Sequence, residues 1–312
     1  MKPLLIILGP TASGKTHLAT RIADQIQGEI ISADSRQVYR NMDIGTGKDI
    51  NEYTIAGKQI PYHLIDIKDA GEQYNVNEFQ KDFRNVYQEI AGRNAVPIVC
   101  GGTGFYIYSL LKGHAFSAIP VNKSLRMEIE MLTQEELHRK FESSITAYSS
   151  LADTSTRKRL IRAIEISEFL IRNPDRGQQT FLQSSEYETL IFGIDPPVEI
   201  RRERISVRLK YRLENGLIGE VERLLKSGLS GEQLIYYGLE YKFVTMYLLG
   251  QMNYSDMSQR LEAEIHRFAK RQMTFFRKME KDEIVINWLD YDLSTEEQIK
   301  LIVDNYEKRQ LV

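Results

Sequence analysis

The stretch "LLIILGPTASGKT", residues 4–16, decides the fold of this chain. Its leading apolar residues predict a buried strand, and "GPTASGKT" (9–16) matches the phosphate-binding pattern G-x-x-x-x-G-K-[ST] at every fixed position. Apolar residues then recur at helical spacing and predict a helix over 15–26. Gly9 and Gly14 let the loop turn its backbone N–H groups inward, and the helix presents its positive N-terminal end to the same anion. Lys15 adds a charge and Thr16 offers a hydroxyl to Mg²⁺, so the sequence predicts a P-loop.

The alternation of strand and helix continues beyond this loop. A helix is expected within 76–93, where apolar residues again follow helical spacing. Strand-like runs lie at 29–33, 62–66, 96–100, 189–195 and 284–289. This order is typical of a parallel sheet covered by helices.

The strand rhythm is absent from the middle of the chain. Residues 122–186 are polar and carry mostly helical patterns. We therefore predict an α/β fold, a P-loop NTPase-like parallel sheet flanked by helices, built from residues 1–121 and 187–312. A mostly helical insertion domain, 122–186, would interrupt it.

Composition limits the class of protein. Apolar residues make up 42% of the 312 residues and charged residues 27%, which is normal for a soluble globular protein. No run of eighteen apolar residues exists, so no membrane span is expected. The single cysteine, Cys100, excludes an internal disulfide and fits a reducing cytoplasm, where we expect this protein to act.

A carboxylate follows the second predicted strand. In a parallel sheet the carboxyl ends of the strands open onto one crevice, so Asp34 and the P-loop should face the same pocket. Asp34 could hold Mg²⁺ through water, as in P-loop kinases, or take a proton from a nucleophile. It could also simply cap a loop. The strand at 96–100 ends in a second glycine-rich turn, "GGTGFY", which offers the Thr103 hydroxyl but no metal-binding carboxylate; this disfavours the kinase interpretation.

Basic residues gather in three places although the net charge is −2. A helix over 198–214 would align Arg201, Arg204, Arg208 and Arg212 in one stripe. A helix over 259–281 and the segment "TRKRLIRAIEI" add further basic faces. Separate patches in a slightly acidic chain indicate a long anionic partner, whereas the simpler interpretation is solvated helix faces.

Five motifs taken together resemble one family. "GPTASGKT", "SADSRQVYRNMDIGTGK", "HLIDI", "GGTGFY" and "AKRQMTFFR", in that order, are similar to those of the bacterial tRNA dimethylallyltransferases, over nearly the whole chain. The resemblance implies that the P-loop holds dimethylallyl diphosphate. The prenyl group would pass to N6 of the adenosine 3′-adjacent to the tRNA anticodon, with Mg²⁺ as cofactor and diphosphate as product. It also implies contact with the anticodon stem-loop, and we expect a monomer.

The resemblance carries residue roles with it. Asp34 matches the general base, Thr103 the threonine beside the reacting amine, and Arg208 the arginine that closes on the leaving group. The diphosphate cradle would comprise Gly9, Thr11, Ala12, Ser13, Gly14, Lys15 and Thr16, with Thr16 also on the metal. The tRNA-binding residues would be Asp34, Ser35, Arg36, Gln37, Thr103, Arg126, Lys158, Arg159, Arg162, Tyr241, Lys242, Lys270, Arg271, Gln272 and Arg277.

The chain departs from the family pattern at a few positions. Glu240 stands where many relatives have glycine, and "GTGKD" (45–49) replaces the more usual "GTAKP". These departures bear on RNA selectivity more than on the chemistry. The alternatives that remain are a P-loop kinase of a nucleotide or small molecule and a catalytically silent RNA-binding protein; intact Lys15, Thr16 and Asp34 argue against the latter.

Overall fold

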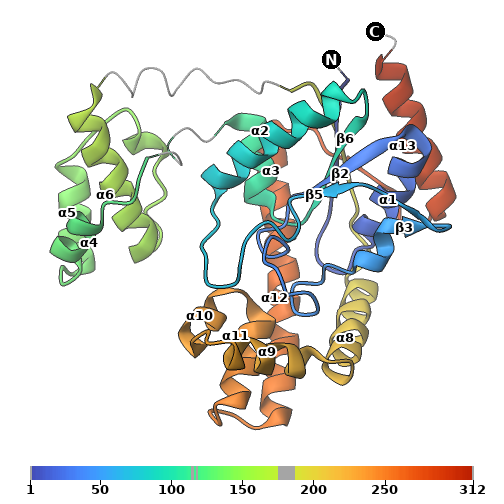
Figure 1. Ribbon diagram of the computed structural model, residues 1–312. Coiled ribbons are helices and arrows are strands. Elements are labelled where there is room, and N and C mark those ends of the chain that lie inside the picture. Colours follow the sequence, from blue (N-terminus) through green and yellow to red (C-terminus); the bar gives the residue numbers. More distant parts are fainter. Residues whose placement is uncertain (1, 114–115, 117–118, 175–186, 311–312) are drawn as a thin grey trace. The chain divides into compact units, whose positions relative to one another are not determined.

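A computed structural model describes residues 2–113, 116, 119–174 and 187–310 (Figure 1). The chain forms two compact units. The larger comprises Met1–Leu111 with Tyr187–Val312, and the smaller comprises Lys112–Glu186. Residues 175–186 of the predicted insertion lie outside the described residues.

A six-stranded parallel sheet forms the centre of the larger unit, in the order β5-β2-β6-β1-β7-β8. The predicted α/β class with a parallel sheet is therefore confirmed. The first strand, β1, lies between β6 and β7, with Ile6 opposite Val99 and Ile191. The strands are β1 (Leu4–Leu8), β2 (Gly28–Ser32), β5 (Tyr62–His63), β6 (Val96–Gly101), β7 (Thr189–Gly193) and β8 (Asn287–Trp288).

Two predicted strands are shorter than expected. The run 62–66 pairs only at Tyr62 and His63, because Leu64 and Asp66 adopt left-handed φ values of 61° and 56°. The run 284–289 pairs only through Asn287 and Trp288. Ile284, Ile286 and Leu289 of this run are nevertheless buried, whereas Val285 is 75% exposed, so the alternation indicated burial and not strand length.

The two faces of the sheet bury alternate residues of each strand. Leu5 and Ile7 face α1 (Lys15–Ile26) and α13 (Thr295–Gln310). Leu4, Ile6 and Leu8 face the opposite core with α2 (Val76–Gly92) and α3 (Gly104–Lys112). Successive side chains of a strand point to opposite faces, so "LLIIL" is buried on both sides.

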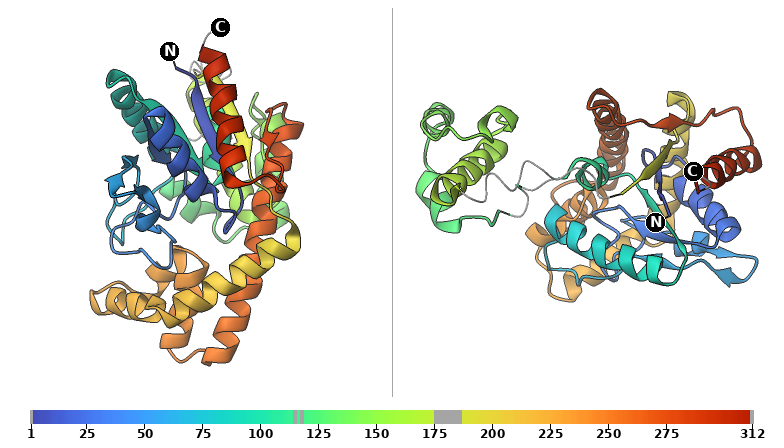
Figure 2. Two further views of the ribbon diagram at one scale, coloured as in Figure 1. Left: turned by 90° about the vertical axis from the view of Figure 1, so that its right-hand side faces the viewer. Right: turned by 90° about the horizontal axis from the view of Figure 1, so that it is seen from above.

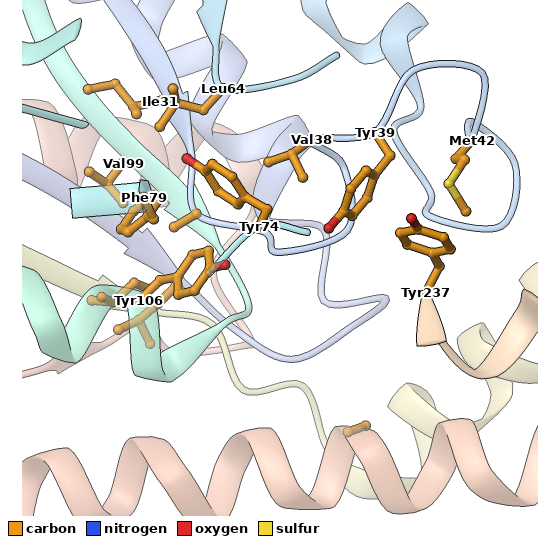
Figure 3. Packing of buried hydrophobic residues seen from close by; sticks show 14 of the residues in the cluster. Ile31, Val38, Tyr39, Met42, Leu64, Tyr74, Phe79, Val99, Tyr106 and Tyr237 are labelled. Atoms are coloured by element: carbon orange, nitrogen blue, oxygen red, sulfur yellow. The ribbon is translucent and has the colours of Figure 1, made fainter. Parts of the chain in front are cut away.

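The core that contains Leu4, Ile6 and Leu8 continues to the helices between β7 and β8 (Figure 3). Tyr237 meets Tyr39 edge to face, with ring centroids 4.6 Å apart. These helices are α8 (Val198–Glu214), α9 (Leu217–Lys226), α10 (Gly231–Tyr236), α11 (Leu239–Leu248) and α12 (Tyr254–Lys281). Within the larger unit, α12 packs against α8 and α11, and Figure 2 shows α8–α12 extending beyond one end of the sheet. A 3₁₀ helix, η1 (Ile50–Tyr53), and a hairpin of β3 (Thr54–Ile55) with β4 (Lys58–Gln59) complete this unit.

The smaller unit is helical in its described residues. It contains α4 (Lys123–Ile129), α5 (Gln134–Glu142), a 3₁₀ helix η3 (Ser149–Leu151) and α6 (Arg157–Arg172). Side chains of α4, α5 and α6 enclose its own small core, formed by Leu125, Ile129, Leu137, Leu160 and Ile164. Such a core gives the unit a source of stability separate from the sheet.

Candidate active site

A cavity of about 1110 Å³ opens at the carboxyl ends of β1, β2 and β6 within the larger unit. The P-loop, the segment Asp34–Gln37 and the turn at Thr103 all line it. Helix α8 and the helices after it form the facing wall. The strand ends therefore meet in one pocket, as the parallel sheet requires.

The P-loop is shaped to receive an anion. Gly14, at the N-cap of α1, has φ of 87°. A Cβ on Gly9 would lie 2.8 Å from the Ile194 carbonyl oxygen. Ser13 Oγ is buried and has no hydrogen-bond partner within the described residues. Burial lowers the pKa of Lys15, while the neighbouring Asp34 carboxylate opposes that shift. A buried ammonium and an unpaired hydroxyl both gain from a bound phosphate group.

Asp34 and Thr103 lie side by side at the pocket. The Thr103 Oγ1 accepts a hydrogen bond of 3.2 Å from the Ser35 N–H, directly after Asp34. The Thr103 N–H in turn donates to the Ala33 carbonyl at 3.2 Å. The Arg36 N–H donates to Asp34 Oδ1 at 2.8 Å and fixes that carboxylate. The structure thus brings the predicted base and the predicted threonine together.

The arginine stripe of α8 faces this pocket. Arg208 donates a hydrogen bond to Thr11 Oγ1 of the P-loop. Burial, together with the adjacent Arg212, lowers the pKa of Arg208 to about 10. Arg204 also lines the pocket, whereas Arg201 is buried against Asp195 at 2.7 Å. Arg204 and Arg208 therefore contribute to the anion site. Arg201 is paired inside the protein, so the prediction that the whole stripe binds a long anionic partner was wrong for this residue.

The loop after Asp34 is anchored from a distant helix. The buried Glu220 carboxylate of α9 accepts hydrogen bonds from the N–H groups of Asp43, Ile44 and Gly45, at 2.9, 2.8 and 3.0 Å. Gln37 closes the loop from inside, because its Nε2 donates to the Gly47 carbonyl at 2.9 Å. Ser35, Arg36 and Gln37 line the pocket as a result.

Lys48 holds the same loop from its other side. Its ammonium is fully buried, donates to the Tyr39 carbonyl at 2.6 Å and pairs with Asp43 and Asp66. Sequence reasoning missed both Lys48 and Glu220. No local pattern could identify Glu220, since its partners lie some 175 residues away.

Two predicted tRNA contacts are corrected by the structure. Gln272 is buried; its Oε1 accepts from the Thr11 N–H and its Nε2 donates to the Gly102 carbonyl, both at 2.8 Å. It joins the two glycine-rich loops. Tyr241 is only 1% exposed and donates its hydroxyl to Glu220 at 2.7 Å. Both side chains are hydrogen-bonded inside the protein; Tyr241 does not line the pocket, whereas Gln272 does.

Other predicted tRNA residues are exposed. Lys242 lies at the pocket with its ammonium 5.4 Å from the Phe243 ring centroid. On α12, Lys270, Arg271 and Arg277 point to solvent, and Arg271 lies 6.0 Å from the Phe268 ring centroid. These side chains remain accessible to an external anion.

In the smaller unit two predicted residues share one buried carboxylate. Arg126 binds both oxygens of Glu165 at 2.7 and 2.9 Å, and Arg162 pairs with it at 3.2 Å. This network ties α4 to α6, so both arginines have a structural task. Lys158 and Arg159 are exposed on α6, and Arg159 pairs with Asp153 at 2.8 Å.

Cys100 and His63 lie on strands β6 and β5 of the sheet. Cys100 is buried, and burial raises the pKa of its thiol to about 12, so it is not a reactive thiolate. His63 has its Nε2 2.7 Å from Glu29, which Arg93 also binds. Both side chains belong to the structural core of the unit.

Fold and site together define a P-loop protein in which an anion cradle and a carboxylate line the same pocket. Comparison with known sequences narrows the class. The family model "IPP transferase" matches residues 37–279, and "Isopentenyl transferase" matches residues 2–60. The chain therefore belongs to the IPP transferase family, as the resemblance predicted.

Named relatives agree with that assignment. A Bacteroides fragilis "tRNA dimethylallyltransferase 2" is 49% identical over 299 residues, 96% of each chain. A Parabacteroides distasonis "tRNA dimethylallyltransferase 1" is 50% identical over 300 residues, 95% of each chain. The kinase alternative is not favoured by these matches.

Solved structures share the fold. A tRNA isopentenylpyrophosphate transferase from Staphylococcus epidermidis has a TM-score of 0.69 at 31% identity, covering 99% of this chain and all of that one. A eukaryotic dimethylallyltransferase acting on tRNA has a TM-score of 0.77 at 22% identity, covering 92% of this chain and 74% of that one. The second likeness bears on the fold alone.

Proposed function

We propose that this chain transfers a dimethylallyl group from dimethylallyl diphosphate to N6 of the adenosine 3′-adjacent to the tRNA anticodon, releasing diphosphate. The observation that carries the proposal is the meeting of three groups in one pocket. The P-loop with Arg208 would hold the leaving group, and Asp34 beside Thr103 would face the incoming amine.

The cationic wall suits the leaving group. Displacement at an allylic carbon requires the charge of the departing diphosphate to be neutralised. Lys15, Arg208 and the loop amides supply preorganised positive groups, and Ser13 Oγ offers a further hydrogen bond. Burial makes these interactions stronger than they would be in water.

The carboxylate suits the nucleophile. The lone pair of an adenine N6 is delocalised into the ring, so a base that accepts its proton as the new bond forms assists the attack. Asp34 is held for this task by the Arg36 N–H, with the Thr103 hydroxyl alongside. The adenine would have to leave its stack to enter the pocket.

The residues also fit Mg²⁺. Among the described residues no three His, Cys, Asp or Glu side chains form a group that could hold a metal ion. Mg²⁺ commonly binds through one or two protein oxygens and the phosphates of a substrate. Thr16 lines the pocket beside the cradle and would hold the ion, which would neutralise charge on the diphosphate.

The exposed basic residues would bind the RNA. Lys242, Lys270, Arg271 and Arg277 in the larger unit, with Lys158 and Arg159 in the smaller, would contact the anticodon stem-loop of tRNA. RNA is read largely through backbone and shape, with a few unstacked bases read directly.

We propose a monomeric cytoplasmic enzyme. Within the described residues no helix is long and apolar enough to cross a bilayer.

A mass measurement tests the proposal. The protein is incubated with Mg²⁺, bulk tRNA and either dimethylallyl diphosphate or ATP. The tRNA is then digested to nucleosides, and their masses are measured. We expect one adenosine to gain a five-carbon prenyl group in the first mixture only. Phosphoryl transfer from ATP, with no mass gain on tRNA, would support the kinase alternative instead.

A variant tests the base. Asp34→Asn should reduce transfer about a hundredfold to ten-thousandfold while tRNA affinity changes by less than about threefold, since general-base catalysis contributes roughly 10²–10⁴-fold. Asp304→Asn, at an exposed position of α13, is the matched control and should keep full activity. Loss of tRNA binding as large as the loss of transfer would reject the general-base role.

A further inference from the structure

Arg212 is a buried arginine on the pocket wall, one helical turn after Arg208. It is 6% exposed, and its Nη2 donates to Asp49 Oδ2 at 3.0 Å. A guanidinium carries five N–H donors. Within the described residues we find no other hydrogen bond from this side chain, so most of its donors have no protein partner.

Gly47, Asp49 and Glu240 lie around Arg212. A Cβ on Gly47 would lie 2.5 Å from Arg212 Nη2, so the guanidinium packs directly against this glycine. Asp49, the ion-pair partner, has φ of 44°, which proline cannot adopt. Glu240 lines the same pocket, and Arg212 is the main charge that favours its ionised form.

The local charges leave Arg212 suited to an anion. Lys15, Arg208 and Arg212 all line the cavity. Arg208 and Arg212 repel each other, and this repulsion helps to lower the pKa of Arg208. Two neighbouring guanidiniums, one buried and one partly buried, are stabilised when one anion binds both, and arginine matches phosphate oxygens in a bidentate geometry.

We propose that Arg212 is a second arginine that binds the diphosphate group, positioned for this by Asp49 and Glu240. The inference rests on the proposed function, because the anion it assigns is the leaving group of prenyl transfer. Arg208 would bind the diphosphate from the side of Thr11, and Arg212 from the side of Asp49. Glu240 would limit the cost of burying the second guanidinium in the free enzyme.

Binding of inorganic diphosphate tests this without catalysis. Calorimetry in the presence of Mg²⁺ would compare the wild type with Arg212→Gln, Arg212→Lys and Arg202→Gln. The last is the matched control, an exposed arginine of the same helix that does not line the cavity. We expect Arg212→Gln to weaken binding about tenfold to a hundredfold and Arg202→Gln to change it less than twofold.

The lysine variant separates binding from folding. Arg212→Lys keeps the charge and loses the planar fork, so its affinity should fall between those of the wild type and Arg212→Gln. If both Arg212 variants bind diphosphate within twofold of the wild type, the proposal is wrong even where they lower the thermal unfolding temperature.

The two levels of inference fail separately. A wild type that prenylates tRNA, with variants that bind diphosphate unchanged, would overturn only the role of Arg212. A wild type that adds no prenyl group, with Arg212 variants that bind diphosphate weakly, would overturn only the assignment of the prenyl donor and keep Arg212 as an anion-binding residue.

Discussion

The backbone N–H of Thr11 donates a hydrogen bond of 2.8 Å to Oε1 of Gln272, across 261 residues of sequence. Nε2 of Gln272 donates to the Gly102 carbonyl, so a single side chain of α12 sets the spacing of the two glycine-rich loops. One loop would hold the leaving group and the other carries Thr103. Gln272 is thus a positioning residue for the reaction.

Gln272→Leu should lower kcat about tenfold to a hundredfold. Leucine leaves the Thr11 N–H and the Gly102 carbonyl without a partner, and small misplacements of reacting groups are costly. Affinity for tRNA, measured by filter binding, should stay within threefold. Gln259→Leu, at an exposed position of α12, is the control. A loss of tRNA affinity with unchanged kcat would restore the RNA contact that the resemblance implied.

The sequence predicted those parts of the site whose structure is determined by residues close together in the chain. The P-loop and the helix over 198–214 lie where expected, because glycine spacing and apolar periodicity determine them. Asp34 reaches the pocket because it ends a parallel strand. Helix α12 begins at Tyr254 and not at 259, since Asn253 caps it with a hydrogen bond from the Asp256 N–H.

The remaining parts depend on contacts between distant residues. Tyr241 resembled an RNA contact by its position in a motif, yet its hydroxyl is bound to Glu220. Nothing near Glu220 in sequence indicates that a carboxylate there will meet three backbone amides. Such pairings follow from packing of α9 and α11 against the loop, which a single sequence does not reveal.

The basic face of α12 gives a prediction about salt. Replacing Lys270 and Arg271 together by alanine should weaken tRNA binding and reduce the slope of log K against log salt by about 1.5, since each neutralised phosphate contributes about 0.7–0.9. Equilibrium binding at several salt concentrations measures it. Lys300→Ala with Lys308→Ala on α13 removes the same charge from another helix and should leave the slope unchanged. Equal slopes for the wild type and the α12 variant would remove this face from the interface.

Glu220 should contribute more to the free energy of unfolding than an ordinary buried side chain does. Glu220→Gln leaves one oxygen where two carboxylate oxygens now accept four hydrogen bonds, and its new amide would face N–H donors. We expect unfolding by denaturant to show a loss of about 2–3 kcal/mol. Hydrogen exchange should be faster at the amides of Asp43, Ile44 and Gly45.

The matched control for this change lies two residues further along α9. Glu222 is exposed and, among the described residues, its one ion pair is with Lys226, so Glu222→Gln should stay within about 0.5 kcal/mol of the wild type. Equal effects of the two substitutions would show that Glu220 does not anchor the loop.

Glu240 should make stability depend on pH in the unusual direction. Burial raises its pKa above the ordinary value of 4.5, with Arg212 and Arg208 opposing the shift. The folded protein therefore holds this proton more tightly than the unfolded chain, and ionisation costs stability as pH rises from 4.5 through the folded pKa. Glu240→Gln removes that cost. Over this interval the free energy of unfolding of Glu240→Gln should rise relative to that of the wild type. At lower pH the difference between the two proteins should stay constant.

Denaturant unfolding of both proteins from pH 4 to pH 8 measures the difference. Glu232→Gln, an exposed substitution on α10, should differ from the wild type by a nearly constant amount. If the wild type instead gains on Glu240→Gln as pH rises, attraction to Arg212 and Arg208 outweighs burial. Glu240 would then stabilise the fold as an ionised partner of the two arginines.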